Sequence, residues 1–324
     1  MWRQDLRLLF IAPEFNIYHL EIIKRLERHG YSVDYLKEKK VGFLWDILHK
    51  ISYRVYEALQ TEILLNSLRE LKSKNENYTV LFVIRGEFVD QRVIDYLNRA
   101  FIFEKKISYQ WDSVKNNPQA VTHFRNDFSV YSFDPDDCRV FGFHYQPLFY
   151  IKEGRHDIVH SYDLSFIGVY TEERLNIIKK IHQLYSKKIK IKIKIKINPL
   201  KYLSLKFFEK KLNYVPNDYF TFSNIRYYNV LSIMEKSSIV LDISHVTQSG
   251  LTMRTIEAIG CGSKLLTNNY MVRKEKFYDE SMISLYDISD FSLDINSILK
   301  RKVSPYEKKD YSIDAWLGSL LRSD

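Results

Sequence analysis

The stretch richest in possible chemistry covers residues 238–269. An apolar strand is expected to end at Ile243, and a polar loop then leads into a helix that begins near Leu251 or Thr252. The first N–H groups of a helix have no partner inside the helix, so they bind phosphate. Glu257 follows in the same helix, and a carboxylate accepts hydrogen bonds from two hydroxyl groups. The alternative is an ordinary helix start with a solvated Glu257.

Polar motifs also follow predicted strands in the first half of the chain. Residues 84–87 (IRGE) come after one strand and residues 109–113 (YQWDS) after another, while residues 146–150 (QPLFY) precede a connector. In open parallel sheets, ligands bind beyond the carboxyl ends of the strands. These motifs are therefore placed where side chains reach a ligand.

Residues 134–137 (DPDD) allow two interpretations. A D-x-D spacing after a strand can hold a metal ion for a nucleotide diphosphate. The alternative is a helix start with Asp134 as N-cap, Pro135 at the first position and two acids in the first turn. The fit to helix capping favours the second interpretation.

Other catalytic motifs are missing from the sequence. It contains no G-x-x-x-x-G-K-[ST] phosphate loop, no G-x-G-x-x-G, no H-E-x-x-H, no C-x-x-C and no G-x-S-x-G. ATPase, classical dinucleotide, zinc-protease and serine-hydrolase functions therefore lose their usual support. We expect neither a metal ion nor a cofactor.

Strands and helices alternate around these motifs. Strands are expected at 6–12, 31–36, 78–84, 106–110 and 128–133, and again at 164–169, 189–197, 238–243 and 264–267. Helices are expected at 18–28, 45–71, 89–98, 173–185, 228–235, 252–259 and 313–321. This order predicts an α/β protein with two Rossmann-like, doubly wound domains facing a cleft. We expect the domains at 1–155 and 156–305, with 306–324 forming a C-terminal helix that packs back on the first domain.

The net charge of +9 over 324 residues is concentrated in one segment. Residues 187–211 contain ten lysines and one acid, and the rest of the chain is balanced. Within this segment, KIKIKIKIKI at 188–197 predicts a strand with one dry face and one lysine face, at the edge of a sheet. A solvated edge is favoured over a membrane or nucleic-acid patch.

Composition narrows the class further. The 45% hydrophobic content excludes global disorder, and two cysteines exclude a disulfide framework. The N-terminal apolar run is too short for a signal peptide, and no run approaches the length of a membrane span. We expect a cytoplasmic protein, with peripheral contact to the inner face of the plasma membrane left open.

Residues 238–269 resemble the nucleotide-sugar site of GT-B glycosyltransferases. The resemblance implies that Glu257 binds the ribose and that the helix start binds the donor diphosphate, with Arg254 as a further phosphate contact. The implied phosphate turn comprises Gln248, Ser249, Gly250, Leu251 and Thr252. The family pattern has a second acid about eight residues before the Glu, where this chain has Ser249.

Two further segments fit the same GT-B pattern. Residues 224–235 (NIRYYNVLSIME) correspond to the loop and helix that pack on the nucleobase, which implies contacts from Ile225, Arg226 and Tyr228. The alternative is a core stripe of Tyr227, Leu231 and Met234, and both interpretations stay open. Residues 163–170 followed by Arg174 resemble the first donor-domain strand, with Gly168 at the pyrophosphate.

Taken over nearly the whole chain, the sequence is similar to bacterial lipopolysaccharide and capsule glycosyltransferases, and more loosely to the CgeB-like group. This implies a first domain that binds the acceptor and a second that binds the donor. The implied reaction transfers a sugar from a nucleotide diphosphate to a hydroxyl of an O-antigen, capsule or lipopolysaccharide precursor. Its partners would be the donor and a lipid-linked or oligosaccharide acceptor, with no nucleic acid. A non-catalytic binder of sugar or nucleotide is the alternative.

An inverting transferase needs a general base near the acceptor hydroxyl. Asp112 is the first candidate, followed by Glu14 and Glu87. The alternative role for Asp112 is a helix N-cap. Side chains expected to bind the acceptor are Tyr109, Trp111 and Arg85. The sequence leaves open whether the reaction inverts or retains the anomeric configuration.

Overall fold

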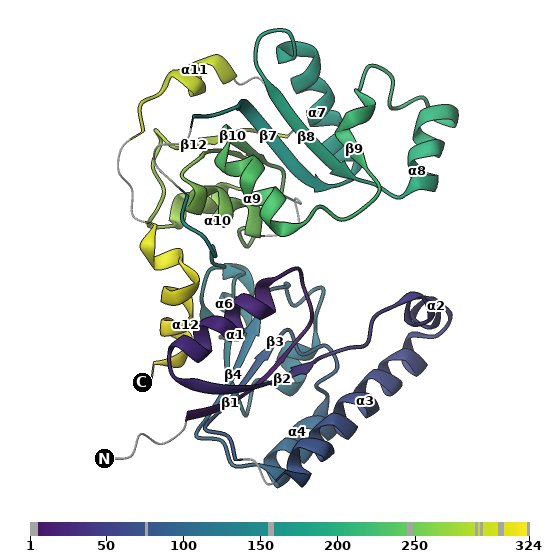
Figure 1. Ribbon diagram of the computed structural model, residues 1–324, viewed down its shortest axis with the longest axis vertical. Helices are drawn as coiled ribbons and strands as arrows, with labels where there is room; N and C mark the ends of the chain where they lie inside the picture. The colour runs from purple at the N-terminus through teal and green to yellow at the C-terminus, as the bar shows by residue number, and fades with distance from the viewer. Residues whose placement is uncertain are drawn as a thin grey trace. The chain divides into compact units, whose positions relative to one another are not determined.

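The computed structural model describes residues 6–74, 77–154, 159–244, 249–288, 291, 294–303 and 308–322. The chain divides into two compact units (Figure 1). Unit 1 comprises residues 1–148 and 313–324, and unit 2 comprises residues 149–312.

Unit 1 is built on a six-stranded parallel sheet in the order β2-β1-β3-β4-β5-β6. Its strands are β1 (Leu6–Ala12), β2 (Tyr31–Lys37), β3 (Val80–Ile84), β4 (Lys105–Gln110), β5 (Ser129–Ser132) and β6 (His144–Tyr145). Its helices are α1 (Tyr18–Arg28), α2 (Phe43–Ile51), α3 (Tyr53–Ser73), α4 (Gln91–Ala100), α5 (Gln119–His123), α6 (Pro135–Phe141) and α12 (Ile313–Leu321). The strand order reverses between β1 and β3.

Unit 2 repeats this plan in the order β12-β11-β10-β7-β8-β9, again all parallel. Its strands are β7 (Tyr162–Val169), β8 (Ile191–Lys196), β9 (Phe220–Thr221), β10 (Ser237–Asp242), β11 (Lys264–Thr267) and β12 (Ile283–Leu285). Its helices are α7 (Glu172–Tyr185), α8 (Pro199–Leu203), α9 (Tyr227–Glu235), α10 (Met253–Cys261) and α11 (Ile295–Lys300). Short helical turns cover Ser204–Phe208, Asn217–Tyr219, Tyr270–Lys274 and Lys309–Tyr311.

The predicted fold class of two Rossmann-like, doubly wound α/β domains is confirmed. Strands β1 and β3 lie inside their sheet, and their apolar runs are buried on both faces. Each sheet has one point where the strand order reverses, between β1 and β3 and between β7 and β10. Such switch points are where ligands bind in open α/β sheets.

The predicted single helix over 45–71 is wrong, because the structure has two helices there. Helix α2 ends at Ile51, and Ser52 adopts an extended backbone. The Ser52 hydroxyl then accepts a hydrogen bond from Val55 N at 3.5 Å as the N-cap of α3. Periodic apolar residues on both sides of Ser52 hide this break in the sequence.

The lysine-rich strand is β8, and the predicted edge position is wrong. Strand β8 lies between β7 and β9, although β9 pairs only with Ile195 and Lys196. The predicted alternation is confirmed, since Ile193 and Ile195 are buried while Lys194 is partly exposed. A two-residue strand such as β9 leaves little apolar signal in the sequence.

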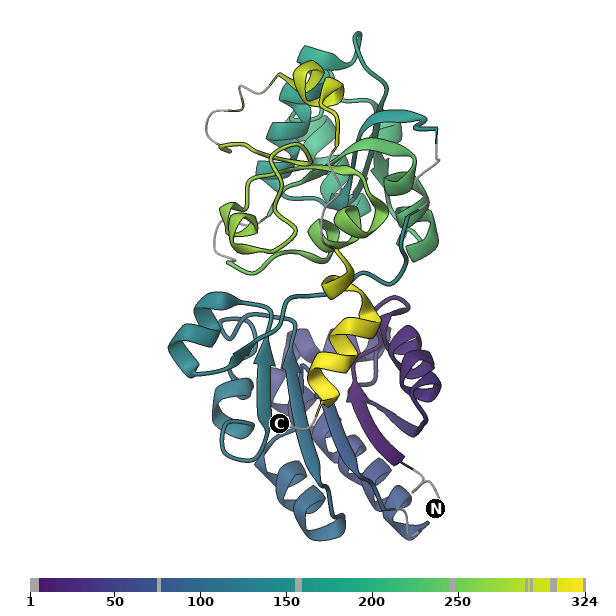
Figure 2. The ribbon, with the colours of Figure 1, turned by 90° about the vertical axis from the view of Figure 1, so that its left-hand side faces the viewer.

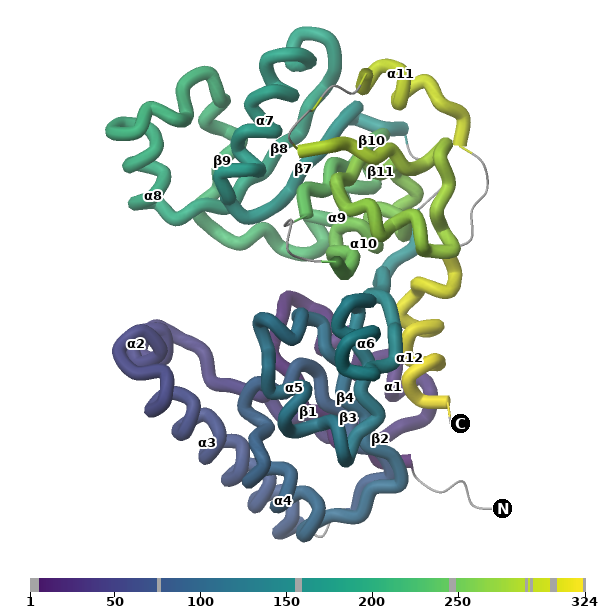
Figure 3. Tube along the Cα trace, turned by 180° about the vertical axis from the view of Figure 1, so that it is seen from behind, coloured from purple at the N-terminus to yellow at the C-terminus, as the bar shows by residue number. Residues whose placement is uncertain are grey.

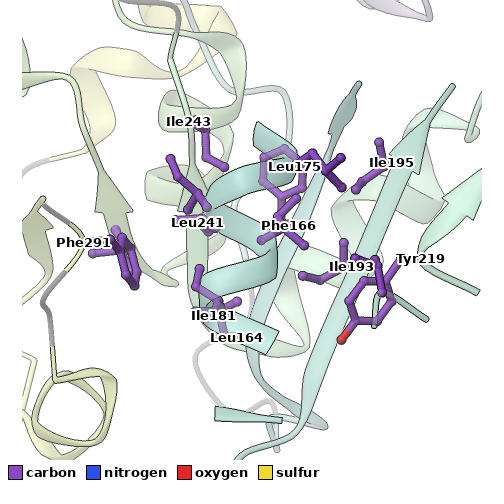
Figure 4. Close-up of a cluster of buried hydrophobic side chains, with 14 of the residues drawn as sticks. Leu164, Phe166, Leu175, Ile181, Ile193, Ile195, Tyr219, Leu241, Ile243 and Phe291 are labelled. Carbon is purple, nitrogen blue, oxygen red and sulfur yellow. The ribbon is translucent and has the colours of Figure 1, made fainter. Parts of the chain in front are cut away.

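Each unit has its own hydrophobic core. Figure 4 shows part of the core of unit 2, where Phe166, Ile193 and Leu241 come from three strands of the sheet. In unit 1, helix α12 lies against the sheet (Figure 2). Its Trp316 is fully buried, with ring centroids 4.8 Å from Tyr109. Within the described ranges, no helix combines the length and apolar character needed to cross a membrane.

Candidate functional site

A buried carboxylate organises the carboxyl edge of the unit 2 sheet. Asp242 ends β10 and is 0% exposed. It accepts hydrogen bonds from the hydroxyls of Ser244 (2.8 Å), Thr252 (3.1 Å), Thr255 (3.0 Å) and Thr267 (3.0 Å), and from Arg254 Nη1 (2.9 Å). These donors come from the loop after β10, the start of α10 and the end of β11. One side chain therefore fixes three elements beside the switch point.

Two arginines meet at the same edge. Arg254 Nε donates to the carbonyl oxygen of Ile167 in β7 at 2.7 Å. Arg174 donates to the carbonyl oxygens of Ile243 (3.0 Å) and Val169 (3.0 Å). Burial, and next the positive charge of Arg254, lower the pKa of Arg174. Among the described residues only Asp242 forms an ion pair with either guanidinium, so Arg174 has no carboxylate partner there and could meet an anion.

Gly168 makes room for this arrangement. A Cβ at Gly168 would lie 2.7 Å from Phe166 Cζ and 3.1 Å from Arg254 Nη2. The Arg254 guanidinium lies over the Phe166 ring, 5.1 Å from its centroid. Gly168, Arg174 and Arg254, which were predicted separately, are thus brought together around β7 and β10.

The start of α10 is held in place from both sides. Thr252 is the N-cap, and its hydroxyl accepts from Thr255 N at 3.2 Å. The Asn269 side-chain amide donates to the carbonyl oxygens of Ser249 (3.4 Å) and Gly250 (3.2 Å). Leu251 is buried. Of the predicted phosphate turn, Gln248 lies outside the described residues.

Glu257 is buried in α10, with 4% of its surface exposed. The alternative of a solvated Glu257 is therefore wrong. Burial, and next the charge of Glu257, raise the pKa of the Cys261 thiol one turn further along. Because Glu257 is buried, its carboxylate can contact a ribose only if the ligand reaches α10.

Helix α9 bears on one of the two interpretations of residues 224–235, and the nucleobase contacts stay a prediction. Tyr227, Leu231 and Met234 are buried, so the core stripe is confirmed. Tyr228 is 59% exposed and Arg226 is exposed, which leaves both open to a ligand. Ile225 lines an open cavity of about 450 Å³ between β8, β9 and α9. The cavity is also lined by Lys192, Lys194, Phe220, Thr221, Asn229, Ser232 and Ile233.

In unit 1, an arginine joins two of the predicted base candidates. Arg85 follows β3 with a left-handed backbone (φ 68°), and Gly86 continues it (φ 71°). Arg85 Nη2 lies 3.1 Å from Glu87 Oε2, and Arg85 Nε lies 3.3 Å from Asp112 Oδ2. Asn117 Nδ2 fixes the turn by donating to the Arg85 carbonyl oxygen at 2.8 Å. Carboxylates after β3 and β4 thus share one cation.

The other acceptor-side predictions fare differently. Glu14 pairs with Lys37 rather than with Arg85. The prediction that Tyr109 binds the acceptor is wrong. Its side chain is 0% exposed, and its hydroxyl donates to the Gln146 carbonyl oxygen at 3.1 Å. Trp111 is half-buried, with its ring edge-on to Phe15 at 5.8 Å between centroids.

Asp112 and Asp134 both follow a strand, but one forms an ion pair and the other caps a helix. Asp134 caps α6 by accepting from Asp136 N (3.0 Å) and Asp137 N (3.4 Å), which confirms the capping interpretation. Asp112 caps no helix among the described residues and pairs with Arg85 instead. In the described part of the chain, no cluster of three His, Cys, Asp or Glu side chains could hold a metal ion.

No family model and no curated protein matches this chain. Among solved structures, the UDP-GlcNAc 2-epimerase of Methanocaldococcus jannaschii, in complex with UDP-GlcNAc and UDP, aligns over 98% of this chain and 99% of its own, with a TM-score of 0.55 and 15% identity. AviGT4, a glycosyltransferase involved in avilamycin A biosynthesis, aligns over 97% and 93%, with a TM-score of 0.55 and 11% identity. The chain has the GT-B fold.

Two buried acids of this GT-B chain were missed by sequence reasoning. Asp242 is a lone acid at the end of an apolar strand, a position that equally fits a surface residue. Glu38 is 1% exposed within a run of charged residues that reads as a solvated loop. Glu38 Oε1 accepts from Phe88 N at 3.4 Å, and its Oε2 has no hydrogen-bond partner among the described residues. Burial, opposed by Arg85 and assisted by Glu87, raises the pKa of Glu38 to about 7.

Replacing Asp242→Asn is expected to lower the free energy of unfolding of unit 2 by about 3 kcal/mol or more, because it leaves the Arg254 guanidinium without its buried counter-ion. Urea unfolding of the full chain measures this cost. The exposed Asp218→Asn serves as the matched control and should change stability little. Equal midpoints for the two variants would show that Asp242 does not hold the edge together.

Glu38 is expected to make stability depend on pH. Its pKa is about 7 in the folded chain against an ordinary 4.5, so the folded state holds the proton more tightly. The free energy of unfolding should therefore decrease by up to about 3 kcal/mol as the pH rises from 4.5 towards 7, and stay constant above pH 7. Unfolding curves of wild type and Glu38→Gln at pH 5 and pH 8 test this, with Glu70→Gln as an exposed control. A pH-independent difference between wild type and Glu38→Gln would contradict the assignment.

Proposed function

We propose that this chain is a glycosyltransferase that moves a sugar from a nucleotide diphosphate to a hydroxyl of a cell-surface glycan precursor. The observation that carries the proposal is the pair of guanidinium groups, Arg174 and Arg254, beside the start of α10 at the switch point of unit 2. A departing nucleoside diphosphate gains negative charge, which cations and helix N–H groups offset without a bound metal. The GT-B fold, shared with nucleotide-sugar enzymes, supports the same conclusion.

The donor would bind along the carboxyl edge of unit 2. In this proposal the diphosphate meets the start of α10 and Arg174, while Arg254 stays paired with Asp242 and supports the edge. Glu257 accepts hydrogen bonds from the ribose hydroxyls. The nucleobase packs against the accessible residues at the start of α9, Ile225 and Tyr228.

The acceptor would bind along the carboxyl edge of unit 1. Asp112 accepts the proton of the attacking hydroxyl in this proposal, and Arg85 holds its carboxylate in place. Trp111 and Phe15 offer aromatic surface to the apolar face of a sugar. Glu87 shares Arg85 and Glu14 pairs with Lys37, so they remain the second set of base candidates.

A nucleotide-sugar epimerase is the second candidate. It is favoured by the alignment with the Methanocaldococcus jannaschii UDP-GlcNAc 2-epimerase, which covers almost all of both chains. An epimerase inverts one carbon of the sugar and needs no acceptor. A non-catalytic binder of the nucleotide sugar would neither transfer nor epimerise the sugar.

Donor binding is expected to raise the melting temperature, because a ligand that binds only the folded chain stabilises it. We expect one of the uridine, guanosine, cytidine or thymidine diphosphate sugars to do so. Glu257→Gln should weaken that binding roughly tenfold, since a hydrogen bond to a charged group is lost. Exposed Glu172→Gln on α7 is the control, and unchanged binding by Glu257→Gln would remove Glu257 from the donor site.

Turnover with a lipid-linked acceptor is expected to need Asp112. Asp112→Asn keeps the shape but cannot accept a proton, so kcat should fall roughly 10²–10⁴-fold while the melting temperature holds. Mass spectrometry and NMR of the products measure transfer and detect any epimerised donor. Asp127→Asn is the control in unit 1. An epimerised donor without transfer would favour the epimerase. A larger loss of kcat in Glu87→Gln or Glu14→Gln would assign the general base to that residue instead.

A further inference from the structure

The segment after the lysine strand leaves large apolar side chains in solvent. Helix α8 runs directly into the turn Ser204–Phe208, and this short helical run buries Tyr202 and Leu205 against unit 2. The α8 surface is defined by the apolar residues that stay exposed. They are Leu200 (76% exposed), Leu203 (45%), Phe207 (62%), Phe208 (85%) and Tyr214 (86%).

The spacing of three of these residues gives them a common face. Leu200, Leu203 and Phe207 follow the i, i+3, i+7 pattern of a helical stripe. Figures 1 and 3 both show α8 at the outer margin of unit 2, beyond β9. Several large apolar side chains exposed on one short helical run indicate an interaction surface.

Lysines surround the α8 surface. Glu209 is the one acid of residues 187–211. Hydrogen bonds from Lys201 (3.0 Å), Ser204 and Lys211 lower its pKa to about 2, so it stays ionised and offsets one of the neighbouring lysine charges. Lys210 is exposed and forms no ion pair within the described ranges. The surface therefore combines apolar side chains with an excess of positive charge.

The lysines of β8 are less available. Lys194 Nζ donates to the Asp218 carbonyl oxygen, and Lys196 Nζ donates to the Asn224 side chain. Lys192 lies over the Tyr162 ring, with its Nζ 5.6 Å from the centroid. Lys206 has comparable contacts, with Tyr202 Oη (3.5 Å) and Asn217 Oδ1 (3.4 Å), but it stands beside the exposed side chain of Phe207.

We propose that the α8 surface docks on a bilayer that contains anionic lipid. Apolar side chains that enter the interface, flanked by lysines that meet lipid phosphates, are the pattern of interfacial helices. The positive excess complements an anionic leaflet, and leucines beside the phenylalanines suit acyl chains better than nucleic-acid bases. The inference does not depend on the proposed reaction, because docking is measured without donor or acceptor.

Co-sedimentation of the full chain with vesicles tests the proposal. Wild type should bind vesicles of phosphatidylcholine with phosphatidylglycerol, and bind pure phosphatidylcholine at least roughly tenfold more weakly. Phe207→Ser/Phe208→Ser should reduce binding to the anionic vesicles roughly tenfold or more. Lys206→Gln/Lys210→Gln should reduce it and flatten its dependence on lipid charge.

Val140→Ser/Leu184→Ser removes exposed apolar side chains from elsewhere and should bind as wild type does. The proposal is overturned if wild type does not bind anionic vesicles or if the Phe207→Ser/Phe208→Ser variant binds unchanged. It is equally overturned if the two phenylalanines prove to hold a dimer in sedimentation velocity, or to bind a single-stranded oligonucleotide more tightly than the vesicles.

Discussion

The buried carboxylate of Asp242 makes the interactions on which the carboxyl edge of the unit 2 sheet depends. An ionised group out of water must have its hydrogen bonds satisfied, and Asp242 has five donors from three elements. The same bonds fix Thr252 at the start of α10 and Arg254 across to β7. Without that carboxylate, the loop after β10, the helix start and the arginine would each need another anchor.

The two units differ in how arginine and carboxylate are paired at this edge. At the switch point of unit 2, Asp242 pairs with Arg254, while Arg174 forms no ion pair within the described ranges. At the carboxyl edge of unit 1, Arg85 pairs with Glu87 and Asp112, Lys39 also pairs with Glu87, and Glu38 is buried. An arginine without a carboxylate partner can meet an anion, and a carboxylate that an arginine holds in place, such as Asp112, can accept a proton. The same doubly wound plan thus carries two different arrangements of charged groups, set by a few side chains.

Most of the fold could be predicted because apolar periodicity is local. Strand 6–12 and helices 18–28 and 313–321 have the predicted bounds. Burial of single polar groups could not be predicted, since it depends on distant partners. Asp242 is satisfied by Thr267 from another strand, and Tyr109 is covered by Trp316 from the C-terminal helix. The strand-end positions of Arg85, Glu87 and Asp112 were predictable, but their common ion-pair network was not.

The lysine segment shows how local partners decide what a charge does. Alternation predicts a lysine face on β8, and the structure gives Lys194 and Lys196 carbonyl and amide partners next to the strand. Such hydrogen bonds hold ammonium groups close to the protein and leave less of their charge for a distant anion. At α8 the lysines also have protein partners, such as Glu209 for Lys201 and Asn217 for Lys206, but they stand beside exposed phenylalanine and leucine, which water solvates poorly. Charge and apolar surface together, rather than charge alone, distinguish α8 from the strand that precedes it.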